Sequence, residues 1–199
     1  MSTLESLFVN SYFDYLLHKF VGLEKLLDIA VKKVPERILE VGCGSGITTS
    51  ILAQRFPHSE ITAIDLDESQ ITRARKRLVN EKVHFLQGDA TRLQFEPHSF
   101  DACVASYALH HMPAFPRALR EIHRILYPGA HLYVLEVPFS REVLRVLKEN
   151  KPHEEVEEPA DIRSGFFTKK RLLHELQRAG FRVVQSKGVL RVYLECERV

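Results

Sequence analysis

Three glycines at alternate positions are the first feature of this sequence that points to chemistry. Gly42, Gly44 and Gly46 lie in the segment "ILEVGCGSG" (38–46) and follow an apolar run. Glycine weakens strands and helices, but it lets another group approach the main chain closely. A loop between a strand and a helix also presents backbone N–H groups and a helix N-terminus to a ligand. We therefore predict a ligand site at this loop, with a tight turn that serves only packing as the alternative.

The spacing of the glycines narrows the choice of ligand. The observed pattern is GxGxG, whereas the dinucleotide pattern is GxGxxG, whose third glycine would fall on Ile47. The loop also lacks the GK[ST] ending of a nucleoside-triphosphate site. The sequence therefore disfavours both a triphosphate and a dinucleotide.

Alternating strands and helices are expected to position this loop. Short runs with apolar centres predict parallel strands that are covered on both faces; they lie at 37–42, 60–65, 82–87, 100–106 and 130–137. The tail, residues 181–199, reads as two strands joined near Lys187 and Gly188, and so short a joint requires antiparallel pairing. The pattern indicates an α/β fold with a doubly wound sheet.

Helix signals lie between these strands. Asp67 is the expected N-cap of one helix, and Gln70 three residues later fits a capping box. An apolar stripe over 115–126 predicts a second helix, which the "YPG" of residues 127–129 should end. Thr168 should cap a later helix that ends at Gly180.

These motifs together resemble the class I S-adenosylmethionine-dependent methyltransferases, whose first motif is an acidic residue followed by GxGxG. The resemblance continues in "AIDLD" (63–67), "QGDA" (87–90), "FDACVASYALHHM" (100–112) and "LREIHRILYPGAHLYVLEV" (119–137). It is greatest for the small-molecule branch, methyltransferase type 11, which includes quinone-precursor enzymes. It implies S-adenosyl-L-methionine as cofactor and a Rossmann-like seven-stranded sheet, mostly parallel, with a C-terminal antiparallel hairpin and helices on both faces.

Asp65 is the main side chain expected at the cofactor. A carboxylate at the end of the second strand can accept hydrogen bonds from both ribose hydroxyls; a helix cap is the alternative role. The resemblance implies that Leu66 lies against adenine and that Asp89 accepts from the adenine amino group, although an ordinary Asp turn stays open for Asp89. The full expected cofactor set is Glu40, Gly42, Cys43, Gly44, Gly46, Asp65, Leu66, Asp89, Ala90, Ala105, Ser106 and Tyr107.

Three residues of this set have a second possible role. Glu40 is an acid within an apolar strand, so it needs partners, either from the cofactor's amino-acid end or from the protein alone. Tyr107 either faces the sulfonium or packs in the core. Cys43 has no neighbouring base in the sequence that would activate it, so we do not expect a nucleophile there.

His110 and His111 are the candidate catalytic residues. Methyl transfer needs a base only when the nucleophile arrives protonated, and histidine can take that proton near neutral pH. The alternative is that one histidine caps the next helix and the other packs. Adjacent histidines rarely supply a tetrahedral metal site, and no metal is expected.

Length and composition set the wider frame. The 199 residues suit one domain, divided into a helical cap (1–35), a cofactor-binding core (36–137), a substrate-side insertion (138–167) and a final helix with hairpin (168–199). A net charge of +2 makes nucleic acid an unlikely partner. Three cysteines without a CxxC pair, no bilayer-length apolar stretch and no secretory signal favour the cytoplasm.

The expected function is methyl transfer to an O, N or C nucleophile of a small molecule. Two alternatives remain open: a cofactor-binding partner subunit without transfer activity, and a methyltransferase of RNA or protein. The sequence favours no particular oligomeric state.

Overall fold

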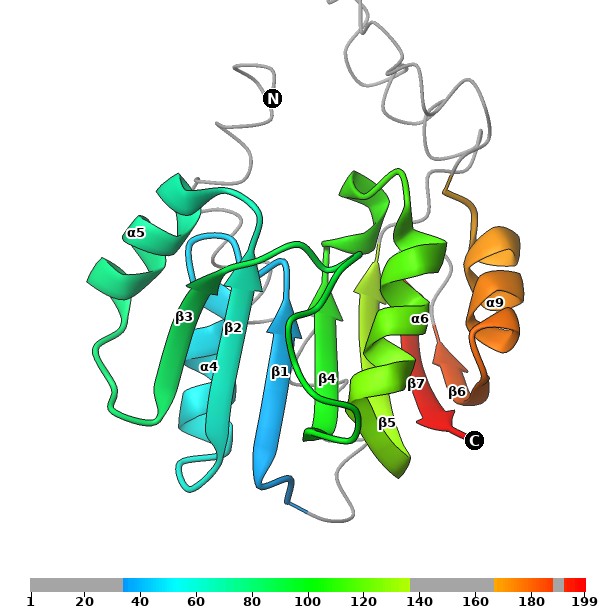
Figure 1. Ribbon diagram of the computed structural model, residues 1–199, viewed down its shortest axis with the longest axis horizontal. Helices are drawn as coiled ribbons and strands as arrows, with labels where there is room; N and C mark the ends of the chain where they lie inside the picture. The colour runs from blue at the N-terminus through cyan, green and yellow to red at the C-terminus, as the bar shows by residue number, and fades with distance from the viewer. Residues whose placement is uncertain (1–33, 137–166, 188–191) are drawn as a thin grey trace, which may run out of the picture.

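A seven-stranded sheet forms the centre of the protein, with strand order β3-β2-β1-β4-β5-β7-β6 (Figure 1). The computed structural model describes residues 34–136, 167–187 and 192–199. The strands are β1 (Arg37–Val41), β2 (Glu60–Asp65), β3 (Val83–Gln87), β4 (Phe100–Ser106), β5 (Leu126–Glu136), β6 (Phe181–Lys187) and β7 (Val192–Arg198). Neighbours among β1 to β5 pair in parallel, whereas β7 pairs antiparallel with both β5 and β6. The predicted sheet and hairpin are confirmed.

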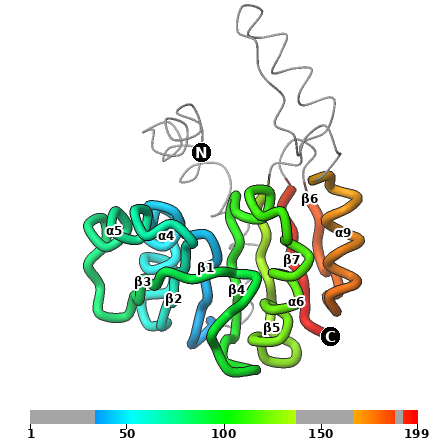
Figure 2. Tube along the Cα trace, turned by 45° about the horizontal axis from the view of Figure 1, so that its top comes forward, coloured from blue at the N-terminus to red at the C-terminus, as the bar shows by residue number. Residues whose placement is uncertain are grey.

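Helices cover both faces of the sheet (Figures 1 and 2). They are α4 (Ile47–Arg55), α5 (Glu68–Arg77), α6 (Phe115–Ile125) and α9 (Lys169–Arg178), with a short 3₁₀ turn, η2 (Leu109–His111). In β1, Ile38 packs in the cluster beneath α4, and the next residue, Leu39, packs in the cluster beneath α6. This alternation follows from the two-residue period of a strand and explains the continuous apolar runs in the sequence.

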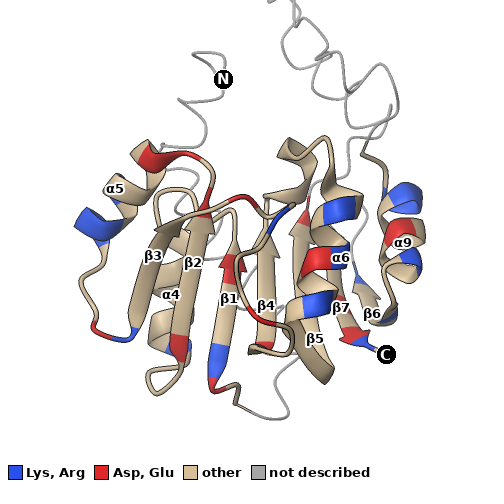
Figure 3. Ribbon diagram, viewed as in Figure 1, with Lys and Arg blue, Asp and Glu red and all other residues tan. Residues whose placement is uncertain are grey.

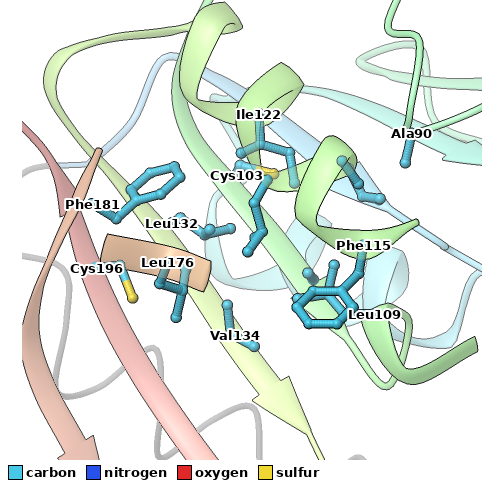
Figure 4. Close-up of a cluster of buried hydrophobic side chains, with 14 of the residues drawn as sticks. Ala90, Cys103, Leu109, Phe115, Ile122, Leu132, Val134, Leu176, Phe181 and Cys196 are labelled. Atoms are coloured by element: carbon cyan, nitrogen blue, oxygen red, sulfur yellow. The ribbon is translucent and has the colours of Figure 1, made fainter. Parts of the chain in front are cut away.

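The larger of the two clusters that β1 joins, called the larger cluster below, lies between the sheet and the helices α6 and α9. Figure 4 shows side chains of β4, β5, α6 and α9 meeting there. Leu109 and Phe115, at either end of the segment that follows β4, are both fully buried in this cluster. The core therefore fixes the backbone on both sides of His110 and His111.

The start of β5 differs from the prediction. Helix α6 ends at Ile125 as expected, but β5 begins at Leu126 instead of residue 130. Its register against β4 shifts between Phe100 and Ala102, which is the mark of a bulge, and Gly129 has a φ of +76° there. The "YPG" segment thus ends the helix and then forms an irregular first part of the strand.

One of the predicted helix caps is wrong in its details. Asp67 is the N-cap of α5 and accepts from the Ser69 N–H at 2.8 Å, as predicted. The reciprocal half of the capping box does not form, because the Asp67 N–H donates to Asp65. Gln70 is buried, and its Oε1 has no hydrogen-bond partner among the described residues. The cap of α9 by Thr168 and its end at Gly180 are confirmed.

Parts of the predicted substrate side lie outside the described residues. These are the helical cap (1–35) up to residue 33 and the substrate-side insertion (138–167) up to residue 166. Over the described ranges, no helix is long and apolar enough to cross a membrane.

Candidate active site

Acidic residues mark the carboxyl ends of three parallel strands (Figure 3). Glu40 is the penultimate residue of β1, Asp65 ends β2 and Glu136 ends β5. In an open parallel sheet, the carboxyl ends of the strands form the edge at which ligands bind. The loop that follows β1 and the segment that follows β4 meet at this edge.

The glycine loop joins β1 to α4 and is held by β2. The N–H groups of Gly42 and Cys43 donate to the Ile64 carbonyl at 2.8 and 2.9 Å. Gly42, Gly44 and Gly46 have φ values of +71°, +51° and +79°, in the left-handed region that favours glycine. Backbone conformation alone therefore explains why the sequence places glycine at all three positions.

The surroundings of the three glycines differ. A Cβ atom at Gly42 would lie 2.5 Å from the Cβ of Ala108, and one at Gly46 would lie 3.0 Å from that of Ala74. A Cβ atom at Gly44 would meet no described atom within 4 Å. Packing against the protein thus adds a second reason for glycine at Gly42 and Gly46, whereas Gly44 is the position of the three where a ligand could still approach the main chain.

The carboxylate of Asp65 lies directly beside Gly44. Its Oδ2 accepts from the Gly44 N–H at 2.8 Å and its Oδ1 from the Asp67 N–H at 3.0 Å. These two backbone donors fix the orientation of the carboxylate, and each oxygen retains the capacity for a further donor. Because Asp67 is the helix cap, the alternative role for Asp65 is wrong.

Glu40 and Cys43 lie beneath this loop. Glu40 is buried and accepts from the Thr49 hydroxyl of α4 at 2.6 Å, so the protein itself supplies one of the partners that a buried carboxylate needs. Burial raises the pKa of the Cys43 thiol, and the charges of Glu40 and Asp65 raise it further. Cys43 is therefore a neutral thiol near pH 7, in agreement with the expectation that it is no nucleophile.

The candidates for the adenine side come from two loops. Leu66 is 69% exposed, and Ala90 is buried in the larger cluster. Asp89 is exposed and its Oδ1 accepts from the Thr91 N–H at 2.8 Å, which is an Asx turn. The turn orients Asp89 and is compatible with either of the roles considered above.

The residues at the end of β4 differ in what they can offer a ligand. Ala105 is fully buried in the core, whereas Ser106 is buried with an Oγ that has no partner in the part of the chain described. Tyr107 has a φ of +52° and packs against the cluster beneath α4. A bulky residue with positive φ is uncommon and costs energy, so the surrounding structure must hold it in place.

A buried glutamate binds His110. Glu136 is fully buried, and its Oε2 lies 2.6 Å from Nδ1 of His110. Its Oε1 accepts from the N–H groups of Ala108 and Leu109 at 3.0 and 2.7 Å. Three nitrogen atoms thus surround one carboxylate, and β5 fixes both the turn after β4 and the imidazole ring.

The two histidines differ in their environment. The side chain of His110 is 11% exposed, whereas His111 is an exposed residue whose ring lies on that of His110, with 3.9 Å between centroids. The Phe167 ring, which belongs to the predicted substrate side, lies 6.1 Å from His110 and 5.2 Å from Phe115. Over the described ranges, no group of three His, Cys, Asp or Glu residues could hold a metal ion.

Glu136 was not among the residues predicted from the sequence. A signal was present, because Glu136 is a charged residue at the carboxyl end of an otherwise apolar parallel strand, as Glu40 is. Its partner lies 26 positions earlier in the chain, and only the pairing of β4 with β5 brings the two together.

Comparison with known proteins gives the family. Residues 39–134, which include the glycine loop, His110 and most of β5, match the family model described as "Methyltransferase domain". This segment of the chain resembles a methyltransferase domain. The match begins within β1 and ends within β5, so the parallel part of the sheet is the part that the family shares.

Two curated relatives match the same part of the chain. A demethylmenaquinone methyltransferase of Thermus thermophilus is 33% identical over 116 residues, 57% of this chain and 53% of that protein. A phthiotriol/phenolphthiotriol dimycocerosates methyltransferase of Mycobacterium leprae is 38% identical over 108 residues, 54% of this chain and 40% of that protein. The chain thus spans about half the length of the curated relatives it matches.

Solved structures extend the likeness to the whole fold. A S-adenosylmethionine-dependent methyltransferase from Aquifex aeolicus aligns over 100% of both chains, with a TM-score of 0.75 and 17% identity. A S-adenosylmethionine-dependent methyltransferase from Thermotoga maritima, described as a possible histamine N-methyltransferase, aligns over 100% of both chains at 25% identity and a TM-score of 0.69. The expected Rossmann-like methyltransferase fold is confirmed.

The cofactor of this class is S-adenosylmethionine, and the residues of the methyltransferase domain fit it. The main chain at Gly44 is open to a ligand, an oriented carboxylate lies beside it, and Ser106 has a buried hydroxyl without a partner among the described residues. A ribose and an amino-acid end offer donors and acceptors for such groups.

Proposed function

We propose that this protein transfers the methyl group of S-adenosylmethionine to a small-molecule acceptor. The observation that carries the proposal is the open main chain at Gly44, with the Asp65 carboxylate fixed beside it. A second support is that this loop lies inside the segment that matches the methyltransferase family. Positioning of acceptor and methyl donor would then supply much of the rate, because the methyl carbon is already activated.

The proposal assigns the cofactor's parts to particular residues. Asp65 would accept from the ribose hydroxyls, Leu66, Asp89 and Ala90 would contact adenine, and Ser106 and Glu40 would serve the amino-acid end. Both Asp65 and Asp89 are already oriented by backbone N–H groups, which lowers the cost of ordering them on binding. The rest of the proposed cofactor surface is Gly42, Cys43, Gly44, Gly46, Ala105 and Tyr107.

The acceptor side would be built around His110. We propose His110, in preference to His111, as the base, because His110 is held by Glu136 and lies against Phe167. The helical cap (1–35) and the insertion (138–167) would supply the remaining walls. The names of the two curated relatives specify a demethylated menaquinone and a phthiotriol lipid as their acceptors. We therefore infer an apolar small molecule as the acceptor of this protein, and the triol in the second name favours an acceptor that carries a hydroxyl group.

We also infer a cytoplasmic location. The three cysteines of the chain are all free and buried, in three separate positions of the sheet and its loop. Burial raises the pKa of each thiol, so all three stay neutral and unreactive at neutral pH. A reducing compartment agrees with this use of cysteine.

A transfer assay tests the proposed function. Binding of S-adenosylmethionine is first measured by calorimetry, and S-adenosylmethionine with a labelled methyl group is then incubated with the protein and a cell extract. We expect label in the solvent-extractable lipid fraction, where mass analysis identifies the product. Cofactor binding without any labelled product would instead support a partner subunit, and label in RNA or protein would support those acceptor classes. Failure to bind the cofactor at all would refute the proposal.

A further inference from the structure

Glu136 has more hydrogen bonds than a structural role for the turn requires. Two backbone N–H groups occupy Oε1, and Oε2 contacts the imidazole of His110. Burying a carboxylate is costly, and a neutral glutamine at the end of β5 could accept from the same two backbone N–H groups without burying a charge. A buried acid at the binding edge of the sheet is therefore expected to act on the group it contacts.

The contact determines which nitrogen of His110 carries a proton. An ionised carboxylate can only accept hydrogen bonds, so the proton between the two groups belongs to Nδ1. In the neutral ring, Nε2 then holds a lone pair and is the basic atom. The bond to Glu136, the tilted ring of His111 and the edge-on ring of Phe167 also restrict rotation of the imidazole.

We propose that Glu136 is the positioning residue of His110, which it keeps in the Nδ1–H form so that Nε2 removes a proton from a hydroxyl of the methyl acceptor. This inference rests on the proposed function, which it makes more specific: the acceptor is one that arrives with its hydroxyl protonated. An acceptor that is already an anion would need neither the base nor the carboxylate behind it.

The O–H bond of the acceptor breaks, its proton joins Nε2, and the oxygen's electron pair forms the bond to the methyl carbon. When bound, S-adenosylmethionine supplies that methyl group and keeps the electron pair of the broken carbon–sulfur bond on sulfur. Glu136 stays ionised, stabilises the imidazolium that forms, and the imidazolium then releases the proton to water.

A second glutamate–histidine pair in the same sheet supplies a matched control. Glu195 of β7 lies 3.0 Å from Nδ1 of His131, in the middle of β5. This contact has no hydrogen-bond geometry, since Nδ1 of His131 has no hydrogen-bond partner in the described part of the chain. In the register of β5 with β7, Glu195 lies opposite Tyr133, which is three residues, or roughly 10 Å, along the strand from Glu136. Glu195→Gln therefore removes the same kind of charge at a place that does not contact His110.

The first experiment reads the tautomer directly by ¹⁵N NMR of the histidine rings, at a pH where the rings are neutral. His110→Ala assigns the signal. In the wild-type protein we expect Nδ1 of His110 to be protonated. In Glu136→Gln, the amide oxygen can keep the two backbone N–H groups while the NH₂ donates to Nδ1, which moves the ring proton to Nε2. Glu195→Gln should leave the His110 signal unchanged. A wild-type ring with its proton on Nε2 would overturn the proposal, even if Glu136→Gln does not fold.

The second experiment measures methyl transfer. We expect Glu136→Gln to lower kcat about 100-fold or more, the range of general-base catalysis, with the Kd for S-adenosylmethionine and the KM for the acceptor within about twofold. Glu195→Gln should keep the wild-type kcat. A normal kcat in Glu136→Gln, or equal losses in both variants, would overturn the role of Glu136. If the wild-type protein transfers no methyl group, the proposed function fails together with the base, whereas the NMR result still decides whether Glu136 sets the tautomer.

Discussion

The two sides of the site are built from different parts of the chain. On the loop side, defined here as residues 40–46 with Asp65, a ligand would meet backbone groups and one carboxylate that two backbone N–H groups hold in place. On the base side, defined as His110 with Glu136, the arrangement depends on one contact between side chains 26 positions apart. Damage to the loop side should therefore appear in cofactor affinity and folding, and damage to the base side should appear in the rate.

The largest expected effect tests the base side. His110→Ala removes the proposed base and should lower kcat about 10²- to 10⁴-fold, whereas His111→Ala, an exposed residue, should change kcat by less than about tenfold. Calorimetry should find the same cofactor affinity in both variants. If the two variants lose equal activity, or if His110→Ala weakens cofactor binding as much as it slows transfer, the separation into two sides is wrong.

The next effect divides the loop side internally. Ala at Gly42 places its Cβ against Ala108 at a positive φ, so Gly42→Ala should destabilise the protein by about 2–4 kcal/mol. Ala at Gly44 meets no described atom, so Gly44→Ala should cost only about 1 kcal/mol of stability. Its methyl group would occupy the space proposed for the cofactor, and we expect a loss of affinity of at least about tenfold. Urea unfolding measures the loss of stability, and calorimetry measures the cofactor affinity. If the two variants lose equal stability and Gly44→Ala keeps the wild-type affinity, this loop does not border the ligand.

A smaller effect tests the carboxylate of the loop side. Asp65→Ala should weaken binding of S-adenosylmethionine about ten- to a hundredfold, the value of hydrogen bonds to a charged group. A cofactor analogue without the 2′-hydroxyl isolates the ribose contact. The wild-type protein should bind this analogue more weakly than it binds S-adenosylmethionine. Asp65→Ala should bind the analogue and S-adenosylmethionine with equal affinity. An equal penalty for the analogue in both proteins would remove the ribose from the role of Asp65.

The sequence predicted the loop side better than the base side, and the reason is physical. The left-handed backbone at Gly42, Gly44 and Gly46 depends on local geometry that only glycine adopts easily, so it is visible as a spacing pattern. The pattern could not reveal which of the glycines pack against the protein, because Ala108 and Ala74 reach the loop from distant parts of the chain. The sequence also placed both histidines after β4, but it did not indicate which of the two is the better candidate for the base. The ranking depends on Glu136, whose position opposite His110 follows from the register of β4 and β5.

The smallest expected effect tests where the loop side ends. Asp67 follows Asp65 by two positions, but its side chain accepts from Ser69 and caps α5. Asp67→Ala should therefore cost about 1 kcal/mol of stability at pH 7 and leave the cofactor affinity unchanged.

Hydrogen bonds from the Ser69 hydroxyl, and then from its backbone N–H, lower the pKa of Asp67 in the folded protein below its ordinary value of 3.8. A lowered pKa adds stability above the unfolded value, and that stability disappears as the pH falls through the folded value. The difference in unfolding free energy between wild type and Asp67→Ala should thus be constant from pH 8 to about pH 5 and shrink below pH 3.8. A difference that stays constant down to pH 3, measured by urea unfolding, would contradict the cap, and a loss of cofactor affinity would extend the loop side to Asp67.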